Sequence, residues 1–323
     1  MGIAQKINQT INTIKYKKLV KKAHKYFSEK KYKEAKETFE QAFSYGFLAI
    51  DYMRYACILC QLEEYSNAVE VINQILASNP PGFIQGWAHA LLGDINFDLT
   101  NSEIAIEEYE KAIECEDFSL DAVCYLKLGT LYDNQESNLE DENVKKAYEY
   151  LKKAQELNNE LLIATYEIGS ILFRSERFEE ALDCFLKVNE KDELKETDCD
   201  FQIGTCYEVL NNMDAAEKYY LEELKHKEPN PATLVTLGLL YMYSNKMDKA
   251  KEVFLKELKI NEENYIAWYD LGCLYALEDD MKNANECFKV LKYKAPDLFN
   301  EINQDPELSE YIKSDYYKAL LDE

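Results

Sequence analysis

Residues 265–298 read YIAWYDLGCLYALEDDMKNANECFKVLKYKAPDL, and they carry the clearest copy of a pattern that runs through the chain. In this stretch Gly272 is followed after twelve positions by Ala284, and after four more by Phe288. The same arrangement returns at intervals of 33–40 residues. Its first position, called the small position below, is occupied by Ala23, Ala56, Gly93, Gly129, Gly169, Gly204, Gly238 and Gly272. A fixed period of this length is typical of repeat architectures.

Two further positions follow the same rule. An alanine lies twelve residues after the small position in seven units, and eighteen residues after it in the fourth: Ala35, Ala68, Ala105, Ala147, Ala181, Ala216, Ala250 and Ala284. Four residues later stands a large apolar side chain: Phe39, Ile72, Tyr109, Leu151, Phe185, Tyr220, Phe254 and Phe288. We expect two amphipathic helices per unit, with small residues where the helices cross and the large residue filling the gap between neighbouring units.

These residues carry a family resemblance. The series Trp268, Leu271, Gly272, Tyr275, Ala284, Phe288 and Pro296 resembles the tetratricopeptide consensus, and the resemblance covers roughly residues 16–298. It implies an all-α superhelical solenoid of about eight helix pairs with terminal capping helices. The expected repeats are 16–48, 49–85, 86–121, 122–161, 162–196, 197–230, 231–264 and 265–298. The first two depart from the family pattern by having Ala in place of Gly.

The C-terminal residues 299–323 are predicted to form a capping helix, because the open end of a solenoid exposes apolar surface. Asp305 and Pro306 read as an N-cap followed by proline at the first helical position. One apolar stripe should then cover the last repeat: Leu308, Ile312, Tyr316, Ala319 and Leu320.

Residues 1–15 are predicted to be a basic amphipathic segment. Ile3, Ile7, Ile11 and Ile14 share one helical face, and lysines follow at 15, 17, 18, 21, 22 and 25. Residues 1–36 carry a net charge of +9, whereas the remaining residues carry −33. Three interpretations stay open: a solvated cap, contact with an anionic membrane through residues 1–25, or docking onto a partner or onto acidic surface of the same or a neighbouring chain.

The fourth repeat contains an acidic insertion, Asn134 to Asn143. Its residues are polar and cannot join an apolar core. We expect a mobile or helix-extending protrusion that tolerates change.

Little in the sequence points to catalysis. The three histidines, His24, His89 and His226, lie in different repeats without metal-ligand spacing. Cys57 and Cys60 form the only CxxC pair, inside a predicted helix and without a second pair for zinc. The sequence therefore predicts no enzyme, no cofactor and no metal site. With only three Arg and a strongly acidic array, we expect no nucleic acid in the groove.

Nine scattered cysteines indicate reduced thiols, and no apolar run is long enough to span a bilayer. No segment at the start has the composition of a secretory signal. These features predict a cytoplasmic protein.

In the tetratricopeptide family the first helix of each pair lines a concave surface that binds peptides or helices. Carried over by phase, the groove positions lie six and three residues before the small position and one and four residues after it. The partner-binding residues chosen from these positions are Phe27, Met53, Trp87, Phe97, Leu126, Tyr166, Phe173, Phe201, Met242 and Tyr269. Val20, Met53, Ala90 and Leu126 stand where the carboxylate-clamp members of the family have polar residues, so that function does not carry over.

The groove is thus expected to be apolar, which usually marks a partner site. The sequence predicts an interaction scaffold or adaptor that binds an apolar segment of another protein. Two alternatives remain, namely a membrane-peripheral assembly factor recruited through its basic N-terminal helix, and a self-associating regulatory subunit.

Overall fold

The computed structural model describes residues 3–115, 118, 121–135, 137–191 and 199–322, the side chains of residues 3–8 excepted. Every regular element in these residues is a helix, as predicted. The chain divides into two compact units, Met1–Ser175 and Glu176–Glu323. The boundary falls inside the fifth predicted repeat, so continuous stacking across it stays a prediction.

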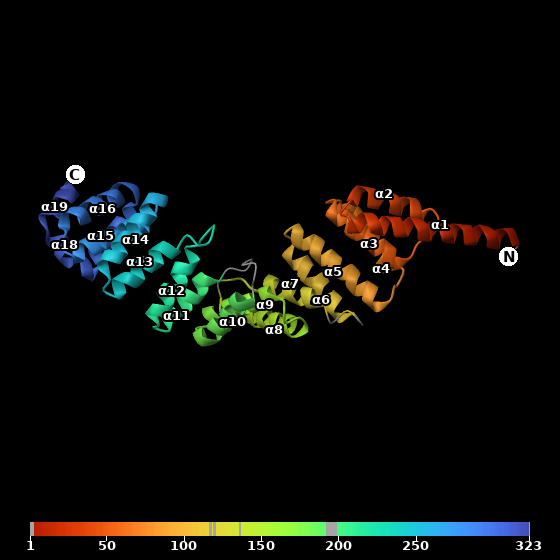
Figure 1. The fold of residues 1–323 in the computed structure, drawn as a ribbon, viewed down its shortest axis with the longest axis horizontal. Coiled ribbons are helices and arrows are strands. Elements are labelled where there is room, and N and C mark those ends of the chain that lie inside the picture. The colour runs from red at the N-terminus through yellow and green to blue at the C-terminus, as the bar shows by residue number, and fades with distance from the viewer. Residues whose placement is uncertain (1–2, 116–117, 119–120, 136, 192–198, 323) are drawn as a thin grey trace. The chain divides into compact units, whose positions relative to one another are not determined.

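The first unit consists of consecutive antiparallel helix pairs followed by one more helix (Figure 1). Its helices are α1 (Ile3–Ser28), α2 (Tyr32–Phe43), α3 (Ala49–Gln61), α4 (Tyr65–Ala77), α5 (Gly82–Asp98), α6 (Ser102–Glu114), α7 (Ala122–Tyr132), α8 (Glu142–Leu157) and α9 (Leu162–Arg174). Each odd-numbered helix from α1 to α7 packs on the even-numbered helix that follows it, and the pairs stack in chain order.

The second unit repeats this plan. Its helices are α10 (Phe178–Lys191), α11 (Asp200–Val209), α12 (Met213–Glu223), α13 (Thr233–Tyr243), α14 (Met247–Ile260), α15 (Tyr265–Leu277) and α16 (Met281–Lys294). Short elements follow: α17 (Pro296–Glu301), the 3₁₀ turns η1 (Ile302–Gln304) and η2 (Pro306–Leu308), α18 (Ser309–Lys313) and α19 (Asp315–Asp322). Here α11 pairs with α12, α13 with α14, and α15 with α16.

The small and large positions of the repeat are buried as predicted. A Cβ added to Gly204 would lie 2.6 Å from the ring of Tyr220, and one added to Gly238 would lie 2.4 Å from that of Phe254. The large side chain therefore packs on the small residue of its own repeat. Phe254 also belongs to one buried cluster with Ala267 and Leu271 of the next repeat, as expected for a side chain that fills the gap between neighbouring repeats.

The turn inside each helix pair has one residue in the left-handed region. In seven repeats it lies seven residues after the small position: Lys30, Glu63, Thr100, Glu176, Asn211, Asn245 and Asp279, with φ between 57° and 62°. The next amide usually closes the turn, for example from Asn101 N to the carbonyl of Asn96 at 2.8 Å. These bonds satisfy carbonyls at the end of the first helix.

The N-terminal segment and the first repeat are continuous. Helix α1 runs from Ile3 to Ser28 without a break at residue 15, where the sequence analysis divided the two. Its contact with α2 begins at the buried residues Tyr16, Val20 and Ala23. Residues 9–15 are all exposed, and Figure 1 shows this part of α1 leading away from the other helices of its unit.

The insertion is not a free protrusion. Arg174 at the end of α9 forms a bidentate ion pair with the buried Asp133 (2.6 and 2.8 Å), and its Nε donates to the carbonyl of Ser137. The Leu139 amide donates to Ser175 Oγ at 3.0 Å. Two residues of α9 and its turn thus contact this loop, which argues against the expectation that it would be mobile. Its last two residues, Glu142 and Asn143, form the start of α8 and so extend a helix as the sequence predicted.

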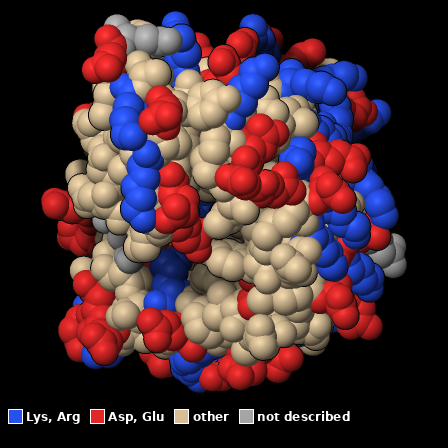
Figure 2. Space-filling model, turned by 90° about the vertical axis from the view of Figure 1, so that its left-hand side faces the viewer, with Lys and Arg blue, Asp and Glu red and all other residues tan. Residues whose placement is uncertain are grey.

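The C-terminal segment covers the last helix pair, although not as one helix. Asp305 caps η2 through the Glu307 amide as predicted, but the backbone is extended at Ser314 and divides the segment. The buried side chains are therefore Leu308, Tyr311, Tyr317 and Leu320, while Tyr316 is 45% exposed. Figure 2 looks onto this end, where Asp and Glu side chains alternate with Lys around uncharged surface.

Candidate functional site

The predicted partner-binding residues of the first unit separate into two groups. Trp87, Tyr166 and Phe173 are partly exposed, and Phe27 and Phe97 are each 36% exposed. The other two lie in the core: Met53 has no exposed surface and Leu126 only 9%. Because these two side chains are buried, they cannot contact a partner, and we leave both out of the proposed surface.

In the second unit all three predicted residues are partly exposed, namely Phe201, Met242 and Tyr269. Phe201 packs on Tyr220, with ring centroids 5.7 Å apart. The Tyr269 hydroxyl donates to Asp305 Oδ2 at 2.8 Å, which ties this side chain to the C-terminal segment.

A hollow of about 390 Å³ opens between α5 and α7 in the first unit. We call it the α5–α7 hollow. It is lined by Trp87, Ala90, Leu91, Asp94, Tyr109, Phe118, Asp121, Val123 and Cys124. Among these, Trp87 is a predicted partner-binding residue, and Ala90, Asp94 and Val123 occupy groove positions of the third and fourth repeats. The structure therefore forms a cavity where the repeat phase places the groove.

Local chemistry positions both walls of the hollow. A Cβ added to Gly86 would lie 2.3 Å from Phe118, so the absence of a side chain there lets this ring pack against α5. On the other wall, Asp121 Oδ1 accepts from the amides of Val123 and Cys124, both at 2.9 Å. This N-cap fixes the start of α7 and thereby the exposed Val123.

The hollow is apolar but carries negative charge. The Tyr109 hydroxyl donates to Asp94 Oδ1 at 2.6 Å. Burial raises the pKa of Asp94; the Tyr109 hydrogen bond and Lys127 oppose this rise, while Asp98 and Asp121 add to it. Lys127 itself lies over the ring of Phe97, 4.1 Å from its centroid. A cationic group of a ligand would reduce the electrostatic repulsion between the carboxylates of Asp94 and Asp121.

The second unit also exposes a row of apolar residues that was not predicted. Val209, Tyr243 and Leu277 lie five residues after the small position in successive repeats, and they are 49%, 79% and 46% exposed. Their spacing of 34 residues was visible in the sequence. The groove assignment stopped one residue earlier and therefore did not include them.

Among the described residues, no three His, Cys, Asp or Glu side chains are grouped so that they could hold a metal ion. Nor does any helix in the described part of the chain have the length and apolar composition needed to cross a membrane.

The comparisons with known proteins agree with the repeat architecture. The family model for the tetratricopeptide repeat matches residues 19–45, 88–115 and 231–264, which lie in the first, third and seventh predicted repeats. The first is matched although it has Ala23 where the consensus has glycine. No curated protein sequence matches the chain.

Solved structures match the fold at low sequence identity. The C-terminal part of a TPR repeat-containing protein from Cytophaga hutchinsonii has 14% identity and a TM-score of 0.60, covering 81% of this chain and 100% of its own. PilF of Pseudomonas aeruginosa has 17% identity and a TM-score of 0.52, covering 68% and 94%. YrrB, a TPR protein with an unusual peptide-binding site, has 23% identity and a TM-score of 0.49, covering 62% and 100%. The helix pairs thus have the fold of tetratricopeptide proteins, and the family model identifies tetratricopeptide repeats at three stretches of the chain.

Proposed function

We propose that this protein is a non-enzymatic interaction scaffold, and that the α5–α7 hollow receives an apolar segment of a partner protein. The observation that carries the proposal is the hollow itself, because it lies at groove positions of two adjacent repeats and has the exposed apolar residue Val123 (53%) at its wall. Concave, mainly apolar sites with a few polar groups are typical of ligand binding. We also propose that the protein is cytoplasmic, because its nine scattered cysteines indicate reduced thiols.

Aromatic side chains are expected to provide most of the affinity. Trp87 lines the hollow, and Phe97 lies four residues after the small position of the same repeat. Large rings bury the most area at interfaces and dominate binding energy there. In the second unit, Val209, Tyr243 and Leu277 would form a second apolar surface of the same kind.

The test uses tryptophan fluorescence. The chain has two tryptophans, so Trp268→Phe leaves Trp87 as the only one. This protein would be titrated with labelled amphipathic helical peptides that carry apolar residues three and four positions apart. We expect the Trp87 emission to change and the anisotropy of the label to rise with the same dissociation constant.

The variant Val123→Lys should weaken this binding by roughly tenfold or more. Ile260→Lys is the matched control, because Ile260 is 70% exposed at the end of α14 in the other unit. If no peptide changes the Trp87 emission, or if Val123→Lys binds as tightly as the control, the hollow is not the binding site.

A further inference from the structure

The exposed face of α1 changes from apolar to basic along the helix. Ile11, Ile14, Lys18, Lys22 and Lys25 follow one another at intervals of three or four residues and therefore lie on one face. Ile11 is 43% exposed and Ile14 is 61% exposed. Residues 9–15, which we call the arm, have no buried side chain, although they belong to a regular helix.

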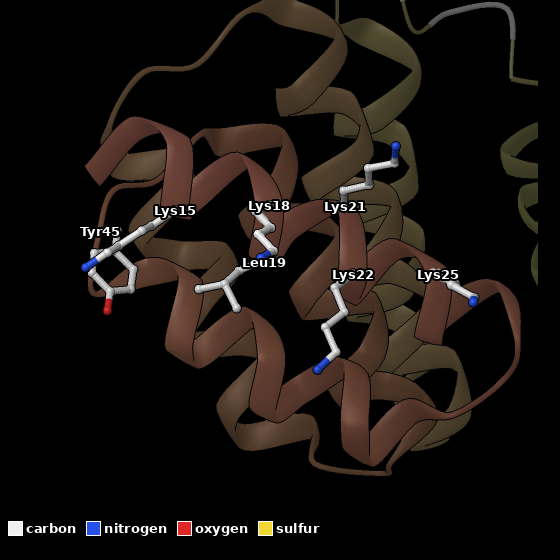
Figure 3. A pocket seen from close by; sticks show the side chains of 7 residues that line it. All are labelled: Lys15, Lys18, Leu19, Lys21, Lys22, Lys25 and Tyr45. Atoms are coloured by element: carbon white, nitrogen blue, oxygen red, sulfur yellow. The ribbon is translucent and has the colours of Figure 1, made fainter. Parts of the chain in front are cut away.

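Behind the arm, lysines surround a shallow hollow of about 590 Å³, which is lined by Lys15, Lys18, Leu19, Lys21, Lys22, Lys25 and Tyr45 (Figure 3). Lys15 Nζ lies 5.0 Å from the ring centroid of Tyr45. Among the described residues, Lys15, Lys18 and Lys22 pair with no carboxylate, and Lys25 meets only Glu29, at 3.7 Å. This surface is unneutralised in a chain whose remaining residues are strongly acidic.

The α5–α7 hollow has the complementary chemistry. Its walls include Trp87, Leu91 and Val123, and it contains the carboxylates of Asp94 and Asp121. In the described residues neither carboxylate forms a salt bridge, although the charge of Lys127 acts on Asp94 from a greater distance. A ligand for this hollow needs apolar side chains for its walls and cationic groups for its carboxylates. A segment with isoleucines beside lysines has both, because it can bury the isoleucines against Trp87 and place ammonium groups near the acids.

The arm cannot reach the hollow of its own chain. Tyr16, Val20 and Ala23 fix α1 against α2, and a straight helix carries residues 9–15 away from α5 and α7 (Figure 1). The acceptor must therefore be another molecule. A second copy of the chain supplies a hollow of matching chemistry.

We propose that the arm of one copy, together with the adjoining Lys18, docks in the α5–α7 hollow of a second copy, with Ile11 and Ile14 against its apolar wall and Lys15 and Lys18 facing Asp94 and Asp121. The contact joins different surfaces of the two copies, so it is head-to-tail and leaves one free arm and one free hollow in a dimer. This inference rests on the proposed function, because it uses the same hollow and names one ligand for it.

The experiment is sedimentation velocity on the full-length chain across a wide range of concentration. Wild type should associate reversibly. The arm variant Ile14→Glu with Lys18→Glu and the hollow variant Val123→Lys should each raise the dissociation constant by roughly tenfold or more. The matched control is Lys256→Glu with Ile260→Glu, which makes the same two changes four residues apart on the exposed face of α14. It should associate like wild type.

Mixing the two defective variants gives the sharpest result. The arm variant keeps an intact hollow and the hollow variant keeps an intact arm, so their mixture should form a dimer that neither forms alone. A monomeric wild type, an arm variant that associates normally, or a mixture that stays monomeric would overturn the inference.

The outcomes also separate this inference from the proposed function. If peptides bind at Trp87 while the chain stays monomeric, the hollow accepts partners but not the arm. A second outcome is that no peptide binds at Trp87 but the chain still associates. If the arm variant then abolishes association and the hollow variant does not, the arm docks at another surface of the second copy. If the monomeric wild type binds vesicles containing phosphatidylserine and the arm variant does not, the arm meets a membrane and the head-to-tail contact is wrong.

Discussion

The two ends of the chain end the stack of helix pairs in opposite ways. At the C-terminal end, Phe299, Tyr311 and Tyr317 pack with Phe288 into a buried cluster. At the N-terminal end, Lys22 stands immediately before the small position and is exposed, whereas the equivalent Leu271 of the eighth repeat packs against the repeat that precedes it and is 1% exposed. An apolar end of a solenoid must be covered by a cap, whereas a basic end can remain in solvent, where its lysines are accessible to a partner.

The largest expected effect concerns the covered end. Tyr311 is 1% exposed, its ring lies 4.8 Å from that of Phe288, and its hydroxyl donates to Asn285 Oδ1. Tyr311→Ala should lower the free energy of unfolding by about 3–5 kcal/mol, because it leaves a cavity and an unpaired amide oxygen. Urea denaturation measures this. The control Tyr316→Ala, in the same segment but 45% exposed, should change stability by less than about 0.5 kcal/mol. Equal effects of the two substitutions would show that the segment does not pack as described.

The second prediction compares the small positions of the two end repeats. A Cβ on Gly272 would lie 2.6 Å from the Phe288 ring, whereas Ala23 already carries a Cβ and is fully buried. Gly272→Ala should lower the free energy of unfolding by about 1–3 kcal/mol through overpacking. Part of this loss is offset because alanine has a higher helix propensity than glycine. Adding Phe288→Leu should recover part of that cost, because the smaller side chain makes room. A stabilised Gly272→Ala protein would mean that the ring moves aside freely.

The fold was predictable because its main rule is periodic. Each small position and the large residue that follows could be found by counting, and their burial follows from packing two helices closely. The close approach of the large residue to the small residue of its own repeat was not predictable in this way, since period alone does not show that Phe254 contacts Gly238 as well as the next repeat. Likewise, the bond from Arg174 to Asp133 joins residues from different repeats, and no local pattern indicates it.

The site was predicted in part. Trp87 lines the α5–α7 hollow, while Met53 and Leu126 are buried although they also lie on the first helices. Both occupy the position three residues before the small position. There Val20 and Ala90 are also at most 8% exposed. A helical face can be assigned from sequence, but whether a neighbouring helix covers it depends on how closely the repeats stack.

The third prediction contrasts the carboxylate of the buried Asp51 with that of the half-buried Asp270. Asp51 in the first unit accepts from the Tyr16 hydroxyl at 2.6 Å and lies 3.3 Å from His24. In the second unit, Asp270 Oδ2 has no partner among the described residues. Burial raises the pKa of Asp270 from 3.8 to about 6. An acid whose pKa is higher in the folded state destabilises the fold once it ionises, so stability should fall as pH rises from about 4 to 6.

Asp270→Asn should therefore stabilise the protein by about 1–2 kcal/mol at neutral pH, and this gain should disappear below pH 4 or so. Thermal unfolding at several pH values measures both. Asp51→Asn is the comparison and should destabilise the protein, because it weakens a satisfied network. If Asp270→Asn gives the same change at pH 3 and pH 7, ionisation of this carboxyl is not the cause.

The smallest expected effect on stability is at the basic end. Lys22→Leu introduces the side chain that the third, fourth, seventh and eighth repeats have before the small position. Lys22 is exposed, and its ammonium group lies 5.3 Å from the centroid of the Tyr26 ring. The free energy of unfolding should therefore change by less than about 0.5 kcal/mol.

Association of the chain should change more than its stability. Leucine beside Leu19 enlarges the exposed apolar surface, while the loss of one ammonium group removes a salt-sensitive attraction. Sedimentation at low and high salt distinguishes these contributions. Association through the lysines weakens with added salt in wild type and less so in Lys22→Leu. If added salt affects both proteins equally, Lys22 takes no part in association and only keeps this end in solvent. The two ends would then differ in how they prevent another helix pair from stacking on them, and not in what they bind.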